Sequence, residues 1–261
     1  MLKNCSFWIN YRSQSLLFLS HFSDGILFLS DSTSEYMSNS LGEEIDGIVV
    51  SGLSCATVLI GVFHRESGLP VAGVINQPFS SLSQDSSSSN QWSGRRLWGV
   101  AHAEHSCYFL GKERSTPNES KRDTMSCNFK IAISGSESEN LKKSLLSTGA
   151  KLFPIAGVGH KLLLVIDGNI DFYVLSHASS FKWDTGAAHA ILCSMGGGVV
   201  SYNEAMTLKL TTKELDKVNL EKCKIMYHKP DDDIGKKWSN VNGVIAFKSY
   251  QRVFELLESL H

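Results

Sequence analysis

The middle of the sequence alternates between short apolar stretches and amphipathic stretches, and this alternation constrains the fold more than any other feature. Residues 129–134, 151–153 and 170–175 have the apolar, β-branched composition of strands. Residues 137–146 and 160–166, which lie between them, have the pattern of helices. Strands that alternate with helices form a sheet that the helices cover. The sequence therefore predicts an α/β fold with layered sheets and helices.

The flanking regions supply further elements. Residues 55–77 contain two apolar runs around a polar turn, which predicts a β-hairpin, and residues 97–102 predict another strand. Two polar segments, 80–90 and 111–126, predict loops. The remaining predicted elements are a helix at 185–194 that ends at glycines 196–198, strands at 199–202 and 243–247, and an amphipathic helix at 249–260.

The charges of the chain are nearly balanced. Its 25 basic and 26 acidic residues give a formal net charge of −1 at pH 7, and 42% of its residues are hydrophobic, enough for a sizeable core. Proteins that bind nucleic acids or anionic membranes usually carry an excess of basic residues. The sequence predicts neither partner, so an anionic ligand must be bound by a local group of residues.

Cysteine spacing and the apolar N-terminal run bear on the compartment. The six cysteines are scattered without a C-x-x-C pair, which favours a reducing, cytoplasmic setting. The apolar run at 16–29 is interrupted by His21, Ser23 and Asp24, so it is too short and too polar to span a membrane. It also lacks the cleavage site of a secretory signal. We expect a cytoplasmic chain without a targeting segment.

The tripeptide Asp31–Ser32–Thr33 follows an apolar run and precedes a segment that could form a helix. A helix start presents free backbone N–H groups, which suits a phosphate group. A second interpretation is a capping box, because Ser32 and Glu35 have the S-x-x-E spacing. The local sequence alone favours the capping box.

Asp184 stands before a run of small and helix-forming residues, where an aspartate is usually a helix N-cap. Magnesium is usually bound by one or two carboxylates together with phosphate oxygens of the substrate. Asp184 therefore becomes informative only together with Asp31.

Three other patterns carry less weight. His102 and His105 have no further metal ligand at a suitable spacing, so a polar strand end is the simpler interpretation. His189 is expected to pack inside its helix. The glycines at 196–198 do not follow a strand, as the glycines of a dinucleotide-binding loop do.

Four segments together resemble the lithium-inhibited, magnesium-dependent phosphatases of the inositol monophosphatase family, and more closely the members that act on inositol polyphosphates. They are DST at 31–33, GLSCATVLIGVFHRESGLPVAGVINQPF at 52–79, AGVGHK at 156–161 and SFKWDTGAAHAILCSMGGGVV at 180–200. The resemblance covers most of the chain from Asp31 onward. It implies a monomeric αβαβα sandwich, here with the N-terminal helical layer missing.

The same resemblance divides the chain into three parts. Residues 1–30 match nothing in the family, residues 31–128 form the remainder of a first α/β unit with the Asp31 motif, and residues 129–261 form a second α/β unit with the Asp184 motif. With the helical layer missing, the sheet built from residues 52–102 is expected to expose an apolar face.

The resemblance also implies roles for individual residues. The carboxylates of Asp31 and Asp184 are implied to hold the second of two magnesium ions, and the carbonyl oxygen of Ser30 is implied to face the first. The implied catalytic residues are Asp31 and Thr33, of which Thr33 activates the attacking water. The residues implied to bind the substrate are Ser32, Thr33, Ser136, Ser138, Gly157 and Lys161.

Several of these residues have a structural explanation as well. Ser136 and Ser138 stand where a helix begins, so they could be caps or solvent-facing residues. Gly157 could allow a tight turn, and Lys161 could be a solvated surface charge. Lys161 is favoured as a ligand because a phosphate ester needs a cation.

The first family motif is incomplete in this chain. Where the family has an aspartate and a proline before the second aspartate, this chain has Phe28 and Leu29. The family also has acidic ligands upstream, whereas residues 1–30 contain one acidic residue, Asp24. Because two-metal hydrolysis needs both ions, we expect weak or absent magnesium-dependent hydrolysis.

Three functional hypotheses remain. The first is a magnesium-dependent, lithium-inhibited phosphatase of phosphatidylinositol signalling that removes the 1-phosphate of inositol 1,4-bisphosphate and inositol 1,3,4-trisphosphate. The second is a bisphosphate nucleotidase, which shares the DST and WD motifs, although the segments INQPF and SFKWDTGAAHAIL favour the first. The third is a non-catalytic protein that binds an inositol phosphate, and Phe28 is its strongest support.

Overall fold

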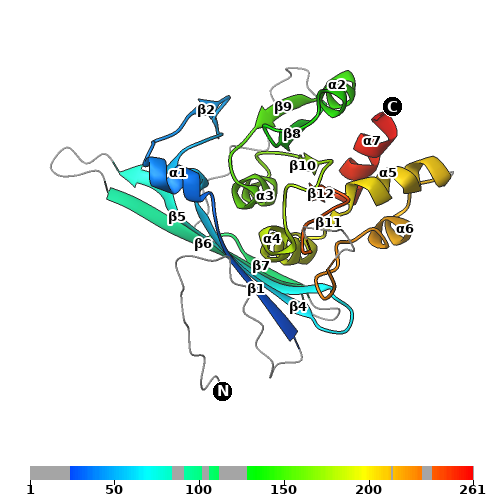
Figure 1. Ribbon diagram of the computed structural model, residues 1–261, viewed down its shortest axis with the longest axis horizontal. Helices are drawn as coiled ribbons and strands as arrows, with labels where there is room; N and C mark the ends of the chain where they lie inside the picture. The colour runs from blue at the N-terminus through cyan, green and yellow to red at the C-terminus, as the bar shows by residue number, and fades with distance from the viewer. Residues whose placement is uncertain are drawn as a thin grey trace.

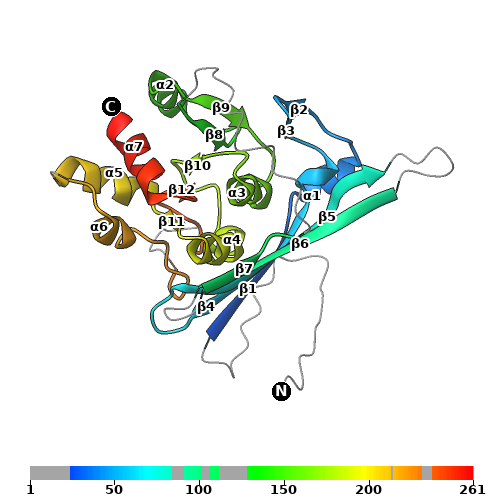
Figure 2. The same cartoon turned by 180° about the vertical axis from the view of Figure 1, so that it is seen from behind.

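The described part of the chain forms four layers. The computed structural model describes residues 24–83, 91–101, 106–111, 128–212, 214–230 and 237–260. Helices α3 and α4 lie between two five-stranded sheets, and helices α2, α5, α6 and α7 lie beyond the second sheet (Figure 1). Figure 2 shows the same order of layers from behind. The predicted α/β fold with layered sheets and helices is confirmed.

The first sheet is antiparallel, with the strand order β1-β4-β5-β6-β7. The predicted hairpin is confirmed as the pair β4-β5, and the strand expected at 97–102 is confirmed as the end of a longer strand, β6. The bounds are β1 (Asp24–Asp31), β4 (Thr57–His64), β5 (Pro70–Ser83), β6 (Gln91–Ala101) and β7 (Ser106–Phe109). Between β1 and β4 lie α1 (Thr33–Ser38), β2 (Glu44–Ile45), β3 (Ile48–Val49) and a 3-10 helix (Leu53–Cys55).

The second sheet is mixed, with the strand order β11-β12-β10-β8-β9. Strand β8 pairs in parallel with both β9 and β10, whereas β12 pairs antiparallel with β10 and β11. The three strands expected between residues 129 and 175 are confirmed as β8, β9 and β10. The bounds are β8 (Lys130–Ile133), β9 (Lys151–Pro154), β10 (Phe172–Leu175), β11 (Gly198–Val200) and β12 (Val244–Phe247).

The helices agree with the sequence in type but not at every boundary. Helix α4 begins three residues before the expected Thr185, and the strand expected at 199–202 ends at Val200 because Ser201 caps α5 by accepting from the Glu204 N–H at 3.3 Å. Helices α5 and α6 were not predicted. The bounds are α2 (Glu139–Ser147), α3 (Val158–Asp167), α4 (Lys182–Ser194), α5 (Tyr202–Thr211), α6 (Lys217–Glu221) and α7 (Tyr250–Ser259).

No helix in the described ranges has the length and apolar content needed to cross a membrane.

Three glycines allow α4 to lie close to the first sheet. Gly61, Gly73 and Gly99 are register partners on the adjacent strands β4, β5 and β6. A Cβ atom on Gly73 would lie 2.0 Å from the carbonyl oxygen of Ala187, and one on Gly61 would lie 2.7 Å from the Ala187 nitrogen. Because these neighbours are backbone atoms of α4, a larger residue at either position would force the helix away from the sheet.

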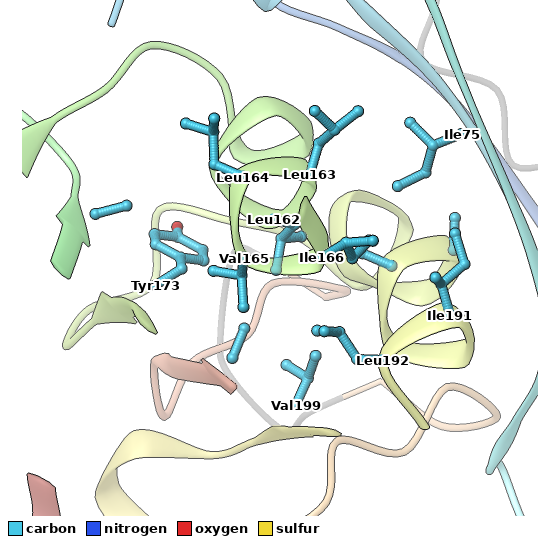
Figure 3. Packing of buried hydrophobic residues seen from close by; sticks show 14 of the residues in the cluster. Ile75, Leu162, Leu163, Leu164, Val165, Ile166, Tyr173, Ile191, Leu192 and Val199 are labelled. Atoms are coloured by element: carbon cyan, nitrogen blue, oxygen red, sulfur yellow. The ribbon is translucent and has the colours of Figure 1, made fainter. Parts of the chain in front are cut away.

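Helix α3 is buried between the two sheets. Residues 162–166 are all buried, and Figure 3 shows them between Ile75 of the first sheet and Tyr173 of the second. The C-terminal end of α3 is held to the first sheet by Arg95, which donates to the two carboxylate oxygens of Asp167 at 3.1 and 2.5 Å. A bidentate pair of this kind fixes geometry as well as adding energy.

The outer face of the first sheet carries a row of apolar side chains. The row crosses all five strands, since each member is the register partner of the next. Four members are 38–48% exposed, so the expected apolar face is present within the described ranges. The row consists of Phe28, Ile60, Val74, Trp98 and Phe109.

Neighbouring residues of β5 test which face is the core. Val74→Thr is expected to change the free energy of unfolding by less than about 0.5 kcal/mol, because Val74 lies on the exposed face and threonine suits strands. Ile75→Thr is expected to cost about 2–4 kcal/mol, because Ile75 is fully buried on the opposite face. Urea unfolding measures both, and equal losses would contradict this assignment of faces.

Candidate active site

Asp31 and Ser32 lie at the junction between β1 and α1. Ser32 has the left-handed backbone conformation (φ 62°), and its side chain makes no capping hydrogen bond. Glu35 accepts from the Gly52 N–H at 2.5 Å, so it belongs to a different contact. The capping-box interpretation is therefore wrong. The Ser32 hydroxyl oxygen is buried, and it has no hydrogen-bond partner within the described ranges.

The start of α3 packs against these two residues. The Gly159 N–H donates to Asp31 Oδ2 at 2.6 Å. A Cβ atom on Gly157 would lie 1.9 Å from the Ser32 hydroxyl oxygen and 2.9 Å from Asp31 Oδ2, and Gly157 also has a positive φ of 73°. Gly157 is therefore more than a turn residue, because its missing side chain leaves room for the Asp31–Ser32 junction.

Asp184 is the third residue of α4 and not its N-cap, because the helix begins earlier than the sequence indicates. The N-cap residue is Phe181, whose backbone N–H donates to Asp184 Oδ2 at 2.6 Å. The side chain is buried nonetheless. Asp184 is thus held in a fixed orientation at the start of a helix that the glycine row places against the first sheet.

Lys161 is buried in α3, so the interpretation as a solvated charge is wrong. Its ammonium group donates to the Ile155 carbonyl oxygen at 2.8 Å and lies 5.4 Å from the centre of the Tyr173 ring. Burial lowers the pKa of Lys161 to about 8, while the charges of Asp31 and Asp184 act in the opposite direction. The lysine therefore shares one electrostatic environment with both aspartates.

The two aspartates are poorly stabilised as anions. Burial raises the pKa of Asp31, although the Gly159 N–H lowers it. Burial also raises the pKa of Asp184 to about 7, the Phe181 N–H lowers it, and the Asp31 charge raises it further. Lys161 does not offset the cost of burying both carboxylates. Such a group of perturbed charges favours a bound cation, and it is typical of functional sites.

The other residues with implied roles lie in different surroundings. Thr33 is the first residue of α1 and is exposed, while Ser30 is an exposed residue of β1 paired with Val58. Ser138 caps α2 by accepting from the Leu141 N–H at 3.2 Å. Ser136 is also exposed.

One residue near Asp31 was missed in the sequence analysis. Thr57 is the register partner of Asp31 on β4, and its hydroxyl oxygen is buried without a hydrogen-bond partner in the described part of the chain. A Cβ atom on Gly159 would lie 2.3 Å from this oxygen and 3.1 Å from Asp31 Oδ2. A threonine at the start of an apolar strand gives no sequence signal, because its role depends on the register with β1.

The acidic residues that the structure describes could supply two carboxylate ligands to a magnesium ion. No group of three or more His, Cys, Asp or Glu side chains that could hold a metal ion occurs among the described residues. Phe28, at the place of the family's first aspartate, points to the outer face of the sheet, away from Leu27 and the core. Asp31 and Asp184 satisfy the usual requirement of one or two carboxylates, with phosphate oxygens and waters completing the shell.

Two of the remaining sequence patterns, the histidine in α4 and the glycines after that helix, have structural roles. His189 is fully buried as expected, and its Nδ1 is 2.9 Å from the Tyr227 hydroxyl. Gly196 has a φ of 90° directly after the C-cap Met195, so the glycines end the helix. His102 and His105 lie outside the described residues.

Both aspartates of the candidate active site lie in a region that matches a known protein family. The model of the inositol monophosphatase family matches residues 31–229. The chain belongs to the inositol monophosphatase family. The first expected motif, Asp31–Thr33, and the second, around Asp184, both fall within this match.

Among the relatives of this family member, inositol polyphosphate 1-phosphatase of Homo sapiens is 35% identical over 242 residues, which are 88% of this chain and 58% of the relative. The chain therefore spans little more than half the length of that enzyme. The 3′(2′),5′-bisphosphate nucleotidase 1 of Dictyostelium discoideum is 30% identical over 149 residues, which are 56% of this chain and 45% of the relative. The inositol phosphate branch is thus the better match.

A solved structure of the family confirms the fold. The crystal structure of an IMPase/NADP phosphatase complexed with Mg2+ and phosphate matches with a TM-score of 0.52 at 10% identity, over 96% of this chain and 70% of that chain. At this identity the likeness supports the architecture alone. The implied sandwich fold is therefore confirmed.

The raised pKa of Asp184 predicts how stability depends on pH. Because the pKa is about 7 in the folded state, above the unfolded value of about 3.9, stability is lost as the pH rises from about 4 to about 7. Asparagine cannot ionise and still accepts from the Phe181 N–H. In metal-free buffer Asp184→Asn is expected to be more stable than the wild type at pH 8, by on the order of 1–3 kcal/mol.

Urea unfolding at pH 4, 6 and 8 in the presence of EDTA measures this difference, which should shrink toward pH 4. Asp216→Asn is the matched control, because Asp216 is an exposed N-cap of α6 and asparagine caps equally well. A stabilisation by Asp184→Asn that is the same at all three pH values would contradict the prediction.

Proposed function

We propose that this family member binds inositol polyphosphates together with magnesium and hydrolyses their 1-phosphate, as in inositol 1,4-bisphosphate and inositol 1,3,4-trisphosphate, in phosphatidylinositol signalling. The observation that carries the proposal is the group formed by Asp184 and Lys161, which are buried, and Asp31, which is half-buried. The 35% identity to an inositol polyphosphate 1-phosphatase supports the substrate class.

The proposal assigns each residue a definite task. The carboxylates of Asp31 and Asp184 would hold the ion at the place of the family's second magnesium, and the Ser30 carbonyl oxygen would face the place of the first. A magnesium ion bound there would supply a water of lowered pKa and would neutralise negative charge on the phosphate. Thr33 accepts a hydrogen bond from the attacking water and orients it. The water oxygen forms a bond to phosphorus as the bond between phosphorus and the inositol oxygen breaks. The water loses one proton to solvent and the inositol oxygen takes one up, so no covalent bond to the protein forms.

The remaining site residues bind the substrate. The phosphate lies against Ser32 and Thr33, and Gly157 makes room for the Ser32 hydroxyl that contacts it. Lys161 compensates the phosphate charge from within α3. Ser136 and Ser138 contact the ring from the loop that precedes α2.

Hydrolysis by this chain is expected to be slow, and this makes a non-catalytic binding protein the second candidate. Two-metal hydrolysis stabilises both the attacking and the leaving oxygen, whereas the described residues offer two carboxylates and an outward-facing Phe28. Such a binding protein would use the same residues to hold an inositol phosphate without turning it over.

The proposal also covers location, oligomeric state, partners and inhibition. We infer a cytoplasmic location, since the four cysteines in the described ranges, Cys55, Cys107, Cys193 and Cys223, form no disulfide. We also infer a monomer, as the family resemblance implies. The balanced charge supports neither a nucleic-acid partner nor a membrane partner. The family resemblance also implies that lithium inhibits the hydrolysis of inositol phosphates by this chain.

Isothermal titration calorimetry with inositol 1,4-bisphosphate tests the proposal. Magnesium is expected to tighten binding by the wild-type chain at least about tenfold, because the carboxylate pair is repulsive without a cation. Asp184→Asn should lose this magnesium dependence, and the control Asp216→Asn should keep it. Phosphate release, measured in parallel, should be slow for all three, and a bisphosphate nucleotide should bind more weakly.

Two results would overturn parts of this proposal. Binding that is indifferent to both magnesium and Asp184→Asn would remove the metal site. Rapid release of phosphate that Asp184→Asn abolishes would show that the metal site is complete, contrary to the expected slow hydrolysis.

A further inference from the structure

A second polar cluster lies outside the residues used above. It is built on Glu137, in the loop after β8, whose side chain is fully buried. Glu137 accepts from the Ser176 hydroxyl at 2.5 Å and from the Ser138 N–H at 3.0 Å. Burial acts to raise the pKa of Glu137, yet these hydrogen bonds hold it below its usual value. Glu137 is therefore a buried anion.

This anion orients His177, in the loop after β10. Oxygen Oε1 of Glu137 is 3.3 Å from His177 Nδ1, so this ring nitrogen carries a proton directed at the carboxylate. The other ring nitrogen, Nε2, is 3.4 Å from the exposed Ser136 hydroxyl. The His177 side chain is 38% exposed. A ligand can therefore reach Nε2, while the contact with Glu137 holds Nδ1 in place.

The cluster lies at the same edge of the second sheet as the candidate active site. Strands β9, β8 and β10 are neighbours and run in parallel, so the loops that follow them emerge side by side. The β9 loop leads to Gly157 and Lys161, the β8 loop holds Ser136 and Glu137, and the β10 loop holds His177. About 10 Å separates β9 from β10.

Tyr173 links the cluster to the active site electrostatically. Burial raises the pKa of Tyr173 well above its usual value, and three carboxylates raise it further. These carboxylates are Asp184, Asp31 and Glu137. The buried glutamate and the two aspartates of the candidate active site therefore act on the same side chain.

The charges of the three loops indicate what His177 can bind. Among residues 134–138, 155–157 and 176–181, His177 is the sole side chain that can carry positive charge. A ring hydroxyl can be bound by serine alone, whereas a phosphate group requires a cation or several N–H donors. His177 can donate to Glu137 through Nδ1 and to an anion through Nε2.

We propose that His177 binds the phosphate group that is not hydrolysed, and so makes the pocket select inositol bisphosphates over inositol monophosphates. This inference rests on the proposed function, because it takes the first phosphate to lie at Asp31, Asp184 and Lys161. Two phosphates on opposite carbons of a six-membered ring can bridge the β9 and β10 loops. Ser136 positions the ring nitrogen through the 3.4 Å contact.

Calorimetric titration of the full chain with inositol 1,4-bisphosphate and with inositol 1-phosphate, both with magnesium, tests the proposal. His177→Ala is expected to weaken bisphosphate binding about 10- to 100-fold, the equivalent of a lost charge-assisted hydrogen bond. Its affinity for the monophosphate should stay within about twofold. His64→Ala is the matched control, since His64 is an exposed histidine that contacts Ser67 through Nδ1 in the first sheet.

His177→Asn separates the loss of the outward N–H from a loss of folding. Its amide can still donate to Glu137, whereas the outward N–H is absent. Thermal unfolding of each variant shows whether the fold is intact. Equal weakening for both ligands, or unchanged bisphosphate binding in His177→Asn, would overturn the role of His177. Failure of the wild type to bind either ligand would overturn the proposed function itself, and the inference with it.

Discussion

The close contact between α4 and the first sheet is the constraint on which the rest of the structure depends. It exists because Gly61, Gly73 and Gly99 form a row without side chains across three neighbouring strands, directly beneath the backbone of the helix. A helix that lies on such a row has little freedom to slide or to rise. Its first turn, which carries Asp184, is thereby held at a fixed height above the sheet whose edge strand carries Asp31.

This arrangement buries more negative charge than the protein itself neutralises. The pKa values of Asp31 and Asp184 are raised while that of the neighbouring Lys161 is lowered, so each group is less stable in its charged form than it would be in water. Assembling such a group of buried charges does not stabilise the fold. A cation with its anionic ligand resolves the conflict, which is why the same residues that destabilise the free chain are the ones we assign to binding.

The sequence predicts the parts of this account that depend on local pattern. The hairpin, the alternating strands and helices and the position of Asp184 near a helix start follow from periodicity and small-residue runs. Register and burial could not be predicted, because they depend on contacts between distant segments. The partnership of Thr57 with Asp31, the burial of Lys161 and the hold of Glu137 on His177 are all of this kind. A local motif can also mislead. The S-x-x-E spacing of Ser32 and Glu35 predicts a capping box, whereas Glu35 accepts from the Gly52 N–H.

The central claim is that Asp31 and Asp184 together hold one divalent ion beside a phosphate ester. Anomalous diffraction from crystals grown with manganese, which prefers the same oxygen ligands as magnesium, and inositol 1,4-bisphosphate tests it most directly. We expect a single anomalous peak about 2.0–2.1 Å from a carboxylate oxygen of each aspartate, with a phosphate oxygen in the same shell. A peak away from this pair, or no peak in crystals that contain the bound ligand, would contradict it.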